Sequence, residues 1–154
     1  MAFECQDVVD KFLERFAVES DAAEQLFLDT KMWLWLNVKA WQEGYKGLAI
    51  NADLEVLDEM WHTFILFTKE YTQFCVSCFG AYLHHKPTTV REKALHQQGY
   101  AADTAQFKSQ LHQRNEAQYE FIYDHLGSAV LERWHLLYPE QFPPLALETL
   151  RYKP

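Results

Sequence analysis

The amino-acid sequence predicts an all-α fold, a single compact bundle of about six or seven helices that forms one domain over residues 1–154. Apolar residues recur at intervals of three and four, and no useful stretch alternates between apolar and polar residues as a half-buried strand does. Only 5 Gly and 5 Pro interrupt the chain, too few for the frequent turns of an all-β sandwich. With 49% hydrophobic residues, including 11 Phe, 8 Tyr and 5 Trp, the chain can fill a core and is not disordered.

Two helices are predicted before residue 45. Apolar residues at helical spacing define the first, over about residues 6–17. Ser20 and Asp21 can cap the second, which ends near Gly44. Because its segment Met32-Trp33-Leu34-Trp35-Leu36 is apolar on every side, this second helix is predicted to be central in the domain.

Two further helices are predicted between residues 51 and 85. Asn51 or Asp53 can begin the third helix, and Thr68 can cap the fourth. The fourth helix has apolar residues at helical spacing through Tyr82 and is predicted to end at His84-His85. The apolar stripe of the third helix consists of Leu54, Leu57, Trp61, Phe64 and Ile65.

A break and a short helix are predicted next. The segment Lys86-Pro87-Thr88-Thr89 interrupts the helical pattern, because a residue before proline is disfavoured in the α conformation. Thr88 or Thr89 together with Glu92 resembles a capping box, which would open a short helix that ends near Gln98.

Two helices are predicted to complete the domain. Asp103 can cap a long, weakly amphipathic helix that reaches Gly127. Ser128 can cap the last helix, and the prolines from Pro139 onward are predicted to end it and leave residues 139–154 as an extended tail.

Charge and cysteine content restrict the partners and the compartment. The chain has 14 Lys+Arg against 22 Asp+Glu, a net charge of −8, so we expect neither nucleic acid nor a membrane surface as partner. The first ten residues lack the basic start of a secretory signal, and the longest uncharged stretch, residues 71–85, is too short and too polar to span a bilayer. Three cysteines without framework spacing indicate a reducing compartment, so we expect a cytoplasmic protein. A protein partner or a small molecule remains open.

Metal-ligating residue types concentrate between residues 58 and 85. Asp58 and His62 are four residues apart, one turn above each other at the edge of the apolar stripe of the third helix. Asp58 could bind a metal or could orient His62 as a ligand. Carboxylate, imidazole and thiolate suit Zn²⁺ or, with fewer thiolates, non-haem iron. The candidate metal ligands are Asp58, His62, Cys75, His84 and His85.

The same residues also have structural explanations. Cys75 and Cys78 fall on the apolar face of their helix, where free cysteine is commonly buried. His84 and His85 could simply occupy a helix C-terminus, where the dipole favours a cation.

His62 also belongs to a second candidate metal-binding motif. Glu59-x-x-His62 and Glu132-x-x-His135 have the spacing found in the di-iron sites of ferritin-like bundles. The helical wheel argues against a di-iron site, because in both motifs the Glu and the His lean away from the apolar stripe of their helix.

The central segment resembles a known family. The residues that carry the likeness are Leu57-Asp58-Glu59-Met60-Trp61-His62, Tyr71, Phe74-Cys75, Phe79-Gly80 and Leu83-His84-His85. This pattern is similar to the bacterial branch of the glycine-rich domain-containing protein-like family, a domain of unknown function, over residues about 54–89 and more loosely from residue 27. The resemblance implies a buried polar site formed by the motif residues, and it implies no activity. Phe64 stands where other members place a second histidine, so a His-x-His pair is not implied.

Three functions of different classes are compatible with these patterns. The first is a small metal-binding domain, in which Glu59 or Tyr71 could supply a nearby acid or base. The alternative is a non-enzymatic interaction module, in which the motif only locks two helices together and aromatic residues contact the partner. The third is an enzyme without metal that uses a Cys75–His pair, which would require Cys75 to leave the apolar face. The candidate contact residues of the interaction module are Trp35, Trp41 and Tyr45.

Overall fold

The computed structural model describes residues 3–86, 89, 91, 94, 104–143, 147 and 149–151. Its regular secondary structure is helical. The predicted all-α class is confirmed. Among these described residues there is no strand, and extended backbone pairs only at an isolated antiparallel bridge between Phe16 and Arg151. Most of the short helix predicted over residues 88–98 lies outside the described residues.

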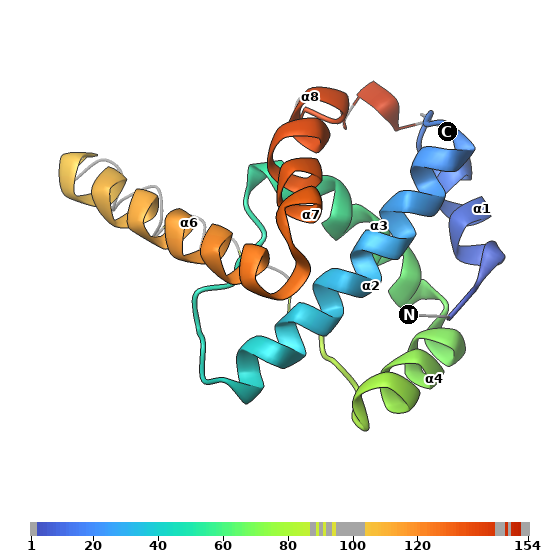
Figure 1. The fold of residues 1–154 in the computed structure, drawn as a ribbon. Coiled ribbons are helices and arrows are strands. Elements are labelled where there is room, and N and C mark those ends of the chain that lie inside the picture. Colours follow the sequence, from blue (N-terminus) through green and yellow to red (C-terminus); the bar gives the residue numbers. More distant parts are fainter. Residues whose placement is uncertain are drawn as a thin grey trace.

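The helices are arranged around α2, which crosses the molecule diagonally in front of α3 (Figure 1). On one side of α2 lie α1 and α4, on its other side lie α7 and α8, and α6 projects from the body of the protein. The elements in chain order are α1 (Gln6–Arg15), α2 (Ser20–Gln42), the short η1 (Ala52–Leu54), α3 (Glu55–Leu66), α4 (Thr68–Phe79), α6 (Thr104–Leu126), α7 (Ser128–Glu132), the π-helical η2 (Arg133–Leu137) and α8 (Tyr138–Gln141).

The hydrophobic core lies between α2 and α3. The predicted central position of α2 is confirmed, since Trp33, Leu34 and Leu36 are all buried. On α3, the ring of Phe64 meets that of Phe27 edge-on at 5.0 Å and that of Tyr71 edge-on at 5.1 Å. Such edge-to-face contacts add to the stability that burial of apolar surface already supplies. The core therefore fixes the orientation of α3 against α2 and α4.

The fourth helix ends earlier than predicted. It stops at Phe79 because Gly80 adopts a left-handed conformation with φ of 75°, which glycine reaches without steric strain. The prediction that this helix continues through Tyr82 and closes at His84-His85 is therefore wrong. Residues 81–86 instead lie outside any helix and lead back toward α3.

The C-terminal helix continues past its proline. The prediction that the prolines from Pro139 onward end this helix and leave residues 139–154 as an extended tail is wrong in part: α8 includes Pro139 and ends at Gln141, before Pro143, and residues 147, 149 and 150 are helical. The π-helical turn of η2 ends at Leu137, two residues before Pro139, and a widened turn at this place can accommodate a proline ring that would clash in a regular helix. Beyond it, Leu147 is buried, and the backbone oxygen of Leu150 accepts a hydrogen bond from the backbone N–H of Ala17.

A buried ionic cluster joins α2 to the C-terminal helices. The carboxylate of Asp29 is fully buried and accepts two hydrogen bonds from the Arg133 guanidinium, at 2.6 and 2.7 Å. It also accepts bonds from the Tyr138 hydroxyl at 2.5 Å and from the Gln25 amide at 3.1 Å. Burial raises the pKa of Tyr138, which keeps its hydroxyl protonated as a donor. This cluster supplies the directional contacts between α2 and η2.

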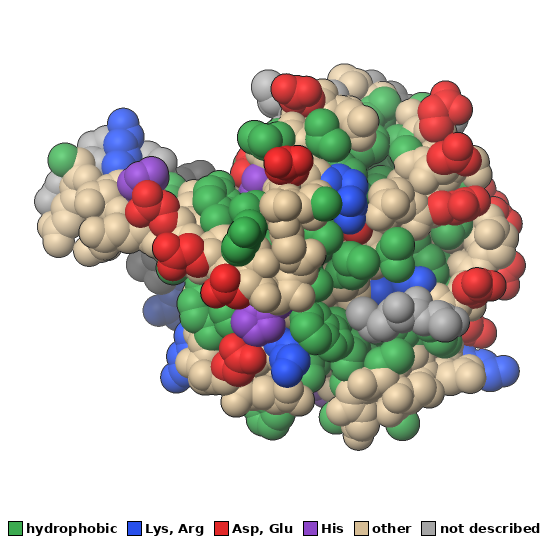
Figure 2. Space-filling view, viewed as in Figure 1, with side chains coloured by type: hydrophobic (Ala, Val, Ile, Leu, Met, Phe, Trp, Pro, Cys, Tyr) green, Lys and Arg blue, Asp and Glu red, His purple; other side chains and the backbone are tan. Residues whose placement is uncertain are grey.

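The surface of the protein is acidic on one side. Figure 2 shows Asp and Glu side chains gathered along the edge that α1 and the beginning of α2 form. In the described part of the chain, no helix combines the length and the apolar character that crossing a membrane would require. Exposed acidic residues on these two helices are Asp7, Asp10, Glu14, Asp21 and Glu24.

Candidate metal centre

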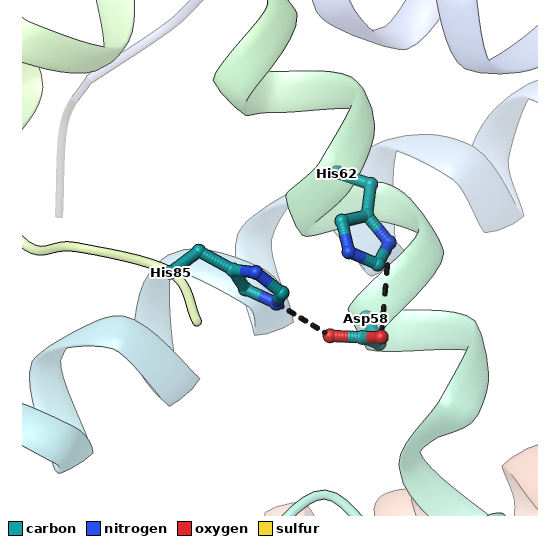
Figure 3. Close-up of side chains that lie close together, drawn as sticks. All are labelled: Asp58, His62 and His85. Carbon is teal, nitrogen blue, oxygen red and sulfur yellow. Dashed lines mark hydrogen bonds and ion pairs between the residues drawn. The ribbon is translucent and has the colours of Figure 1, made fainter. Parts of the chain in front are cut away.

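Three of the predicted ligand residues meet beside α3. Asp58 and His62 lie on successive turns of α3, and His85 reaches them from the segment that follows α4 (Figure 3). His85 Nε2 lies 3.1 Å from one oxygen of the Asp58 carboxylate, and His62 Nδ1 lies 3.7 Å from the other. One ligand atom from each of the three residues lies within 4.8 Å of the other two. The cluster is partly exposed, with side-chain exposures of 28% for Asp58, 41% for His62 and 13% for His85.

A chain of hydrogen bonds holds the segment that carries His85. The indole N–H of Trp61 donates to the Tyr71 hydroxyl at 3.1 Å, and this hydroxyl donates to the backbone oxygen of Leu83 at 2.7 Å. Trp61 also meets the His85 ring edge-on, with ring centroids 4.3 Å apart. Trp61 directly precedes His62 in α3. The same helical turn therefore carries His62 and, through the contacts of Trp61, holds His85 in place.

The other two predicted ligands lie elsewhere. Cys75 is fully buried beside the Tyr71 hydroxyl and the Leu83 backbone, and burial raises the pKa of its thiol. His84 is exposed and its ring packs against Tyr82, at 4.8 Å between centroids. Neither belongs to the group of three that the described residues bring together. Burial of this thiol argues against the Cys75–His enzyme hypothesis, which requires Cys75 to leave the apolar face of its helix.

The three residues open into a pocket of about 640 Å³. A cavity of this size falls in the range of small-molecule sites. Its walls come from α2, from the segment between α2 and α3, from α3 itself and from the end of the His85 segment. The lining residues outside the three are Trp33, Asn37, residues 48–52, Glu55, Trp61 and Lys86.

The two residues expected as a nearby acid or base do not line this pocket. The carboxylate of Glu59 accepts a hydrogen bond from Arg15 at 3.2 Å and another from Arg151, which ties the C-terminal segment to α3. Tyr71 is fully buried, and burial raises the pKa of its hydroxyl far from the range of an acid–base catalyst. Both residues stabilise the fold around the pocket.

Residues of the two Glu-x-x-His motifs have separate partners in the structure. Glu59 is engaged by arginines, whereas His62 faces Asp58. In the second motif, His135 is buried, and its Nδ1 lies 3.0 Å from Asp53 on η1. Burial lowers the pKa of His135, while the contact with Asp53 opposes this shift. The second motif therefore joins η2 to η1.

Sequence reasoning missed several pocket residues. Asn37 on α2 and Glu55 at the start of α3 line the pocket, and Asn37 has no ligand-type residue three or four positions away in the sequence. Glu55 does lie three residues before Asp58, which places the two carboxylates on adjacent turns of one helical face. That spacing is the one local signal that could have identified it.

Replacing Tyr71 by phenylalanine is expected to loosen the His85 segment. The variant leaves the Trp61 N–H and the Leu83 oxygen without their partner, so we expect the free energy of unfolding to fall by about 1–3 kcal/mol. Urea denaturation measures this loss. Tyr82→Phe, which removes a hydroxyl from a ring that is 38% exposed, is the matched control and should change stability by less than about 0.5 kcal/mol. Equal stability of the two variants would show that this hydrogen-bond chain does not hold the segment.

Comparison with known proteins identifies the family. A family model described as UCP032817-like matches residues 18–116, and the chain belongs to this family. The matched range includes all three residues of the cluster. Searches of curated proteins and of solved structures find no match.

The resemblance to the glycine-rich domain-containing protein-like family is therefore wrong. The pattern that suggested this resemblance, over residues 54–89, combines polar residues with aromatic residues such as Trp61 and Tyr71, which pack in the core. Aromatic positions at helical spacing recur in unrelated helical proteins, because they satisfy the same packing requirement. The family model instead covers α2, α3, α4 and part of α6.

Proposed function

We propose that this member of the UCP032817-like family binds one divalent transition metal, Zn²⁺ or Fe²⁺, through Asp58, His62 and His85. The observation that carries the proposal is the convergence of one carboxylate and two imidazoles, from two separate segments, at the wall of a pocket. Two histidines and one carboxylate are a ligand set of catalytic zinc sites and of non-haem iron sites.

The spacing of the ligand atoms supports a single ion. Bonds of about 2.0–2.2 Å to imidazole nitrogen and carboxylate oxygen place neighbouring donor atoms of a tetrahedral or octahedral site roughly 3.0–3.5 Å apart. His85 Nε2 lies 3.1 Å from one oxygen of Asp58 and His62 Nδ1 lies 3.7 Å from its other oxygen, and both distances are close to this requirement. The three ligand atoms, one from each residue, lie within 4.8 Å of one another, so the site must contract when it binds an ion.

Three protein ligands leave at least one coordination position for water or a substrate. All three residues line the pocket, which favours a catalytic or ligand-binding metal over a closed structural one. A metal with an open position supplies a Lewis acid and can activate a bound water. We also infer a cytoplasmic location, which is supported by the three free cysteines Cys5, Cys75 and Cys78.

A structural role for the same residues is the second candidate. Asp58 already contacts both imidazoles, so the cluster could lock the His85 segment onto α3 without a metal. In this interaction module Trp41, which is 79% exposed, would be the contact residue. Tyr45 is less suited to contact a partner, because its ring stacks on Phe121 at 4.5 Å.

Metal stoichiometry distinguishes the two candidates. The protein is dialysed against Zn²⁺ and, without oxygen, against Fe²⁺, and bound metal is measured by elemental analysis. We expect about one ion for each chain of the wild type and of His84→Ala, and little for His85→Ala, because imidazole ligation is lost only in the latter. His84 is the matched control since it neighbours His85 in sequence but lies outside the cluster.

Equal metal binding by His84→Ala and His85→Ala would refute the proposed site. A wild type that binds neither ion would favour the interaction module.

A further inference from the structure

His135 forms the buried polar contact between η2 and η1. Its side chain is only 6% exposed, and its Nδ1 lies 3.0 Å from a carboxylate oxygen of Asp53 on η1. Its ring also packs against Tyr119 of α6, with ring centroids 4.4 Å apart. An ionised carboxylate can only accept a hydrogen bond, so Nδ1 carries the proton of the neutral ring and Nε2 carries none.

The environment of Nε2 disfavours a proton. This atom of His135 is buried from solvent and has no hydrogen-bond partner within the described part of the chain. Protonation would place an N–H there that meets neither water nor an acceptor, which is unfavourable. Burial accordingly lowers the pKa of His135 from its ordinary value of 6.5, although the contact with Asp53 opposes the shift.

Two titratable residues contact this imidazole from other elements of the described structure. They are Asp53 on η1 and Tyr119 on α6. Burial raises the pKa of Tyr119, so its hydroxyl stays neutral at physiological pH. On the same element as His135, the charged residue Arg133 is bound to Asp29. The charge state of His135 therefore follows from its burial and from Asp53.

The contact between His135 and Asp53 holds one wall of the pocket. Residues 48–52 line the pocket, and the last of them, Ala52, is the first residue of η1. Asp53 follows directly, so its bond to His135 attaches this wall to η2. The ring of Trp134, beside His135, also packs edge-on against the pocket residue Trp33 at 5.9 Å. Movement of η1 away from η2 would therefore open the pocket.

We propose that the His135–Asp53 contact is an acid-sensitive latch, in which neutral His135 attaches η1 to η2 and protonation of His135 releases η1 and opens the pocket wall. The latch needs no metal, so this inference is independent of the proposed metal site. Because the released state takes up the proton at a higher pH than the closed state, the closed state is fully stable above pH 6.5, the ordinary pKa of histidine. It loses stability as the pH falls below that value.

NMR of the protein prepared without metal tests the latch. The imidazole signals of His135 are titrated between about pH 8 and about pH 5, the range in which histidine changes its charge. Exchange of the Leu54 amide in D₂O is followed over the same range, because this amide donates to the Asn51 oxygen in the pocket wall at 3.1 Å.

We expect the pKa of His135 to lie below 6.5. Below pH 6.5, the protection of the Leu54 amide relative to an unstructured amide should fall by up to about tenfold for each pH unit, the effect of one proton. The amide of Leu34, in the core of α2, reports global unfolding and should stay better protected than that of Leu54 at every pH.

His135→Asn and His112→Asn are matched variants. An asparagine amide can donate to Asp53 as the Nδ1–H does, but it does not titrate, so His135→Asn is expected to abolish the fall in Leu54 protection. His112 lies on α6 with its side chain 74% exposed, and its replacement should leave that fall unchanged.

Several results would overturn the latch. They are a pKa of His135 at or above 6.5 in the folded protein, an equal pH dependence in the wild type and in His135→Asn, and equal protection of Leu54 and Leu34 at every pH. The titration of the wild type decides the matter if His135→Asn does not fold. Because no metal is present, failure of the latch is distinguishable from failure of the proposed function.

Discussion

Replacing Arg133 by methionine is expected to lower the free energy of unfolding by about 3–5 kcal/mol. The variant removes two short hydrogen bonds from the Asp29 carboxylate, which is fully buried and would retain only its bonds from Tyr138 and Gln25. A buried charge that loses its counter-ion is strongly unfavourable, because neither water nor another cation replaces it. Urea denaturation, fitted to a two-state transition, measures the change.

Two further variants separate this effect from a general loss of arginine. Arg114→Met changes an exposed arginine on α6 and should alter stability by less than about 0.5 kcal/mol. The double variant Asp29→Leu/Arg133→Met removes both charges, so it should be more stable than Arg133→Met alone. A loss below about 1 kcal/mol in Arg133→Met would contradict the importance of the ionic cluster.

Replacing Asp58 by asparagine is expected to weaken Zn²⁺ binding by at least about 100-fold. Loss of residues that only support a ligand costs about 10–100-fold in affinity, and Asp58 is itself proposed as a ligand. At a Zn²⁺ concentration of about 100 times the wild-type dissociation constant, the metal should stabilise the wild type by about 2.7 kcal/mol and the variant by about 0.4 kcal/mol. Unfolding with and without Zn²⁺ measures this difference.

The control for this variant is Glu55→Gln. Glu55 lines the same pocket but does not belong to the group of three ligand residues. The variant removes one negative charge without removing a ligand, so we expect its Zn²⁺ affinity to fall only a few-fold. If both variants weaken binding equally, the pocket attracts the metal by charge alone and Asp58 is not a ligand.

The fold class was predictable because helical periodicity is a local property. The end of α4 was not predicted, although Gly80 is a common type of helix-ending residue. Tyr82 extended the apolar spacing of the helix past this glycine. In the structure Tyr82 packs on Tyr71, with centroids 5.2 Å apart, although it lies beyond the helix end. The position of Tyr82 in the sequence therefore fits a longer helix, although Tyr82 makes its packing contact with Tyr71 from outside the helix.

The candidate site was predictable only in part. Asp58 and His62 follow from the spacing of four residues on one helix, which fixes their mutual position. The choice among Cys75, His84 and His85 could not be made, because it depends on the turn at Gly80 that directs His85 back to α3. The pocket could not be predicted, since α2 and α3 line it together and only their packing creates it.

In the proposed site, Asp58, His62 and His85 bind the metal without a thiolate. X-ray absorption spectroscopy of the Zn²⁺-loaded protein at the zinc edge tests it most directly. We expect nitrogen and oxygen atoms at about 2.0–2.2 Å from the zinc, including the nitrogens of two imidazoles. A sulfur atom at about 2.3 Å would contradict it, because a cysteine would then be a ligand.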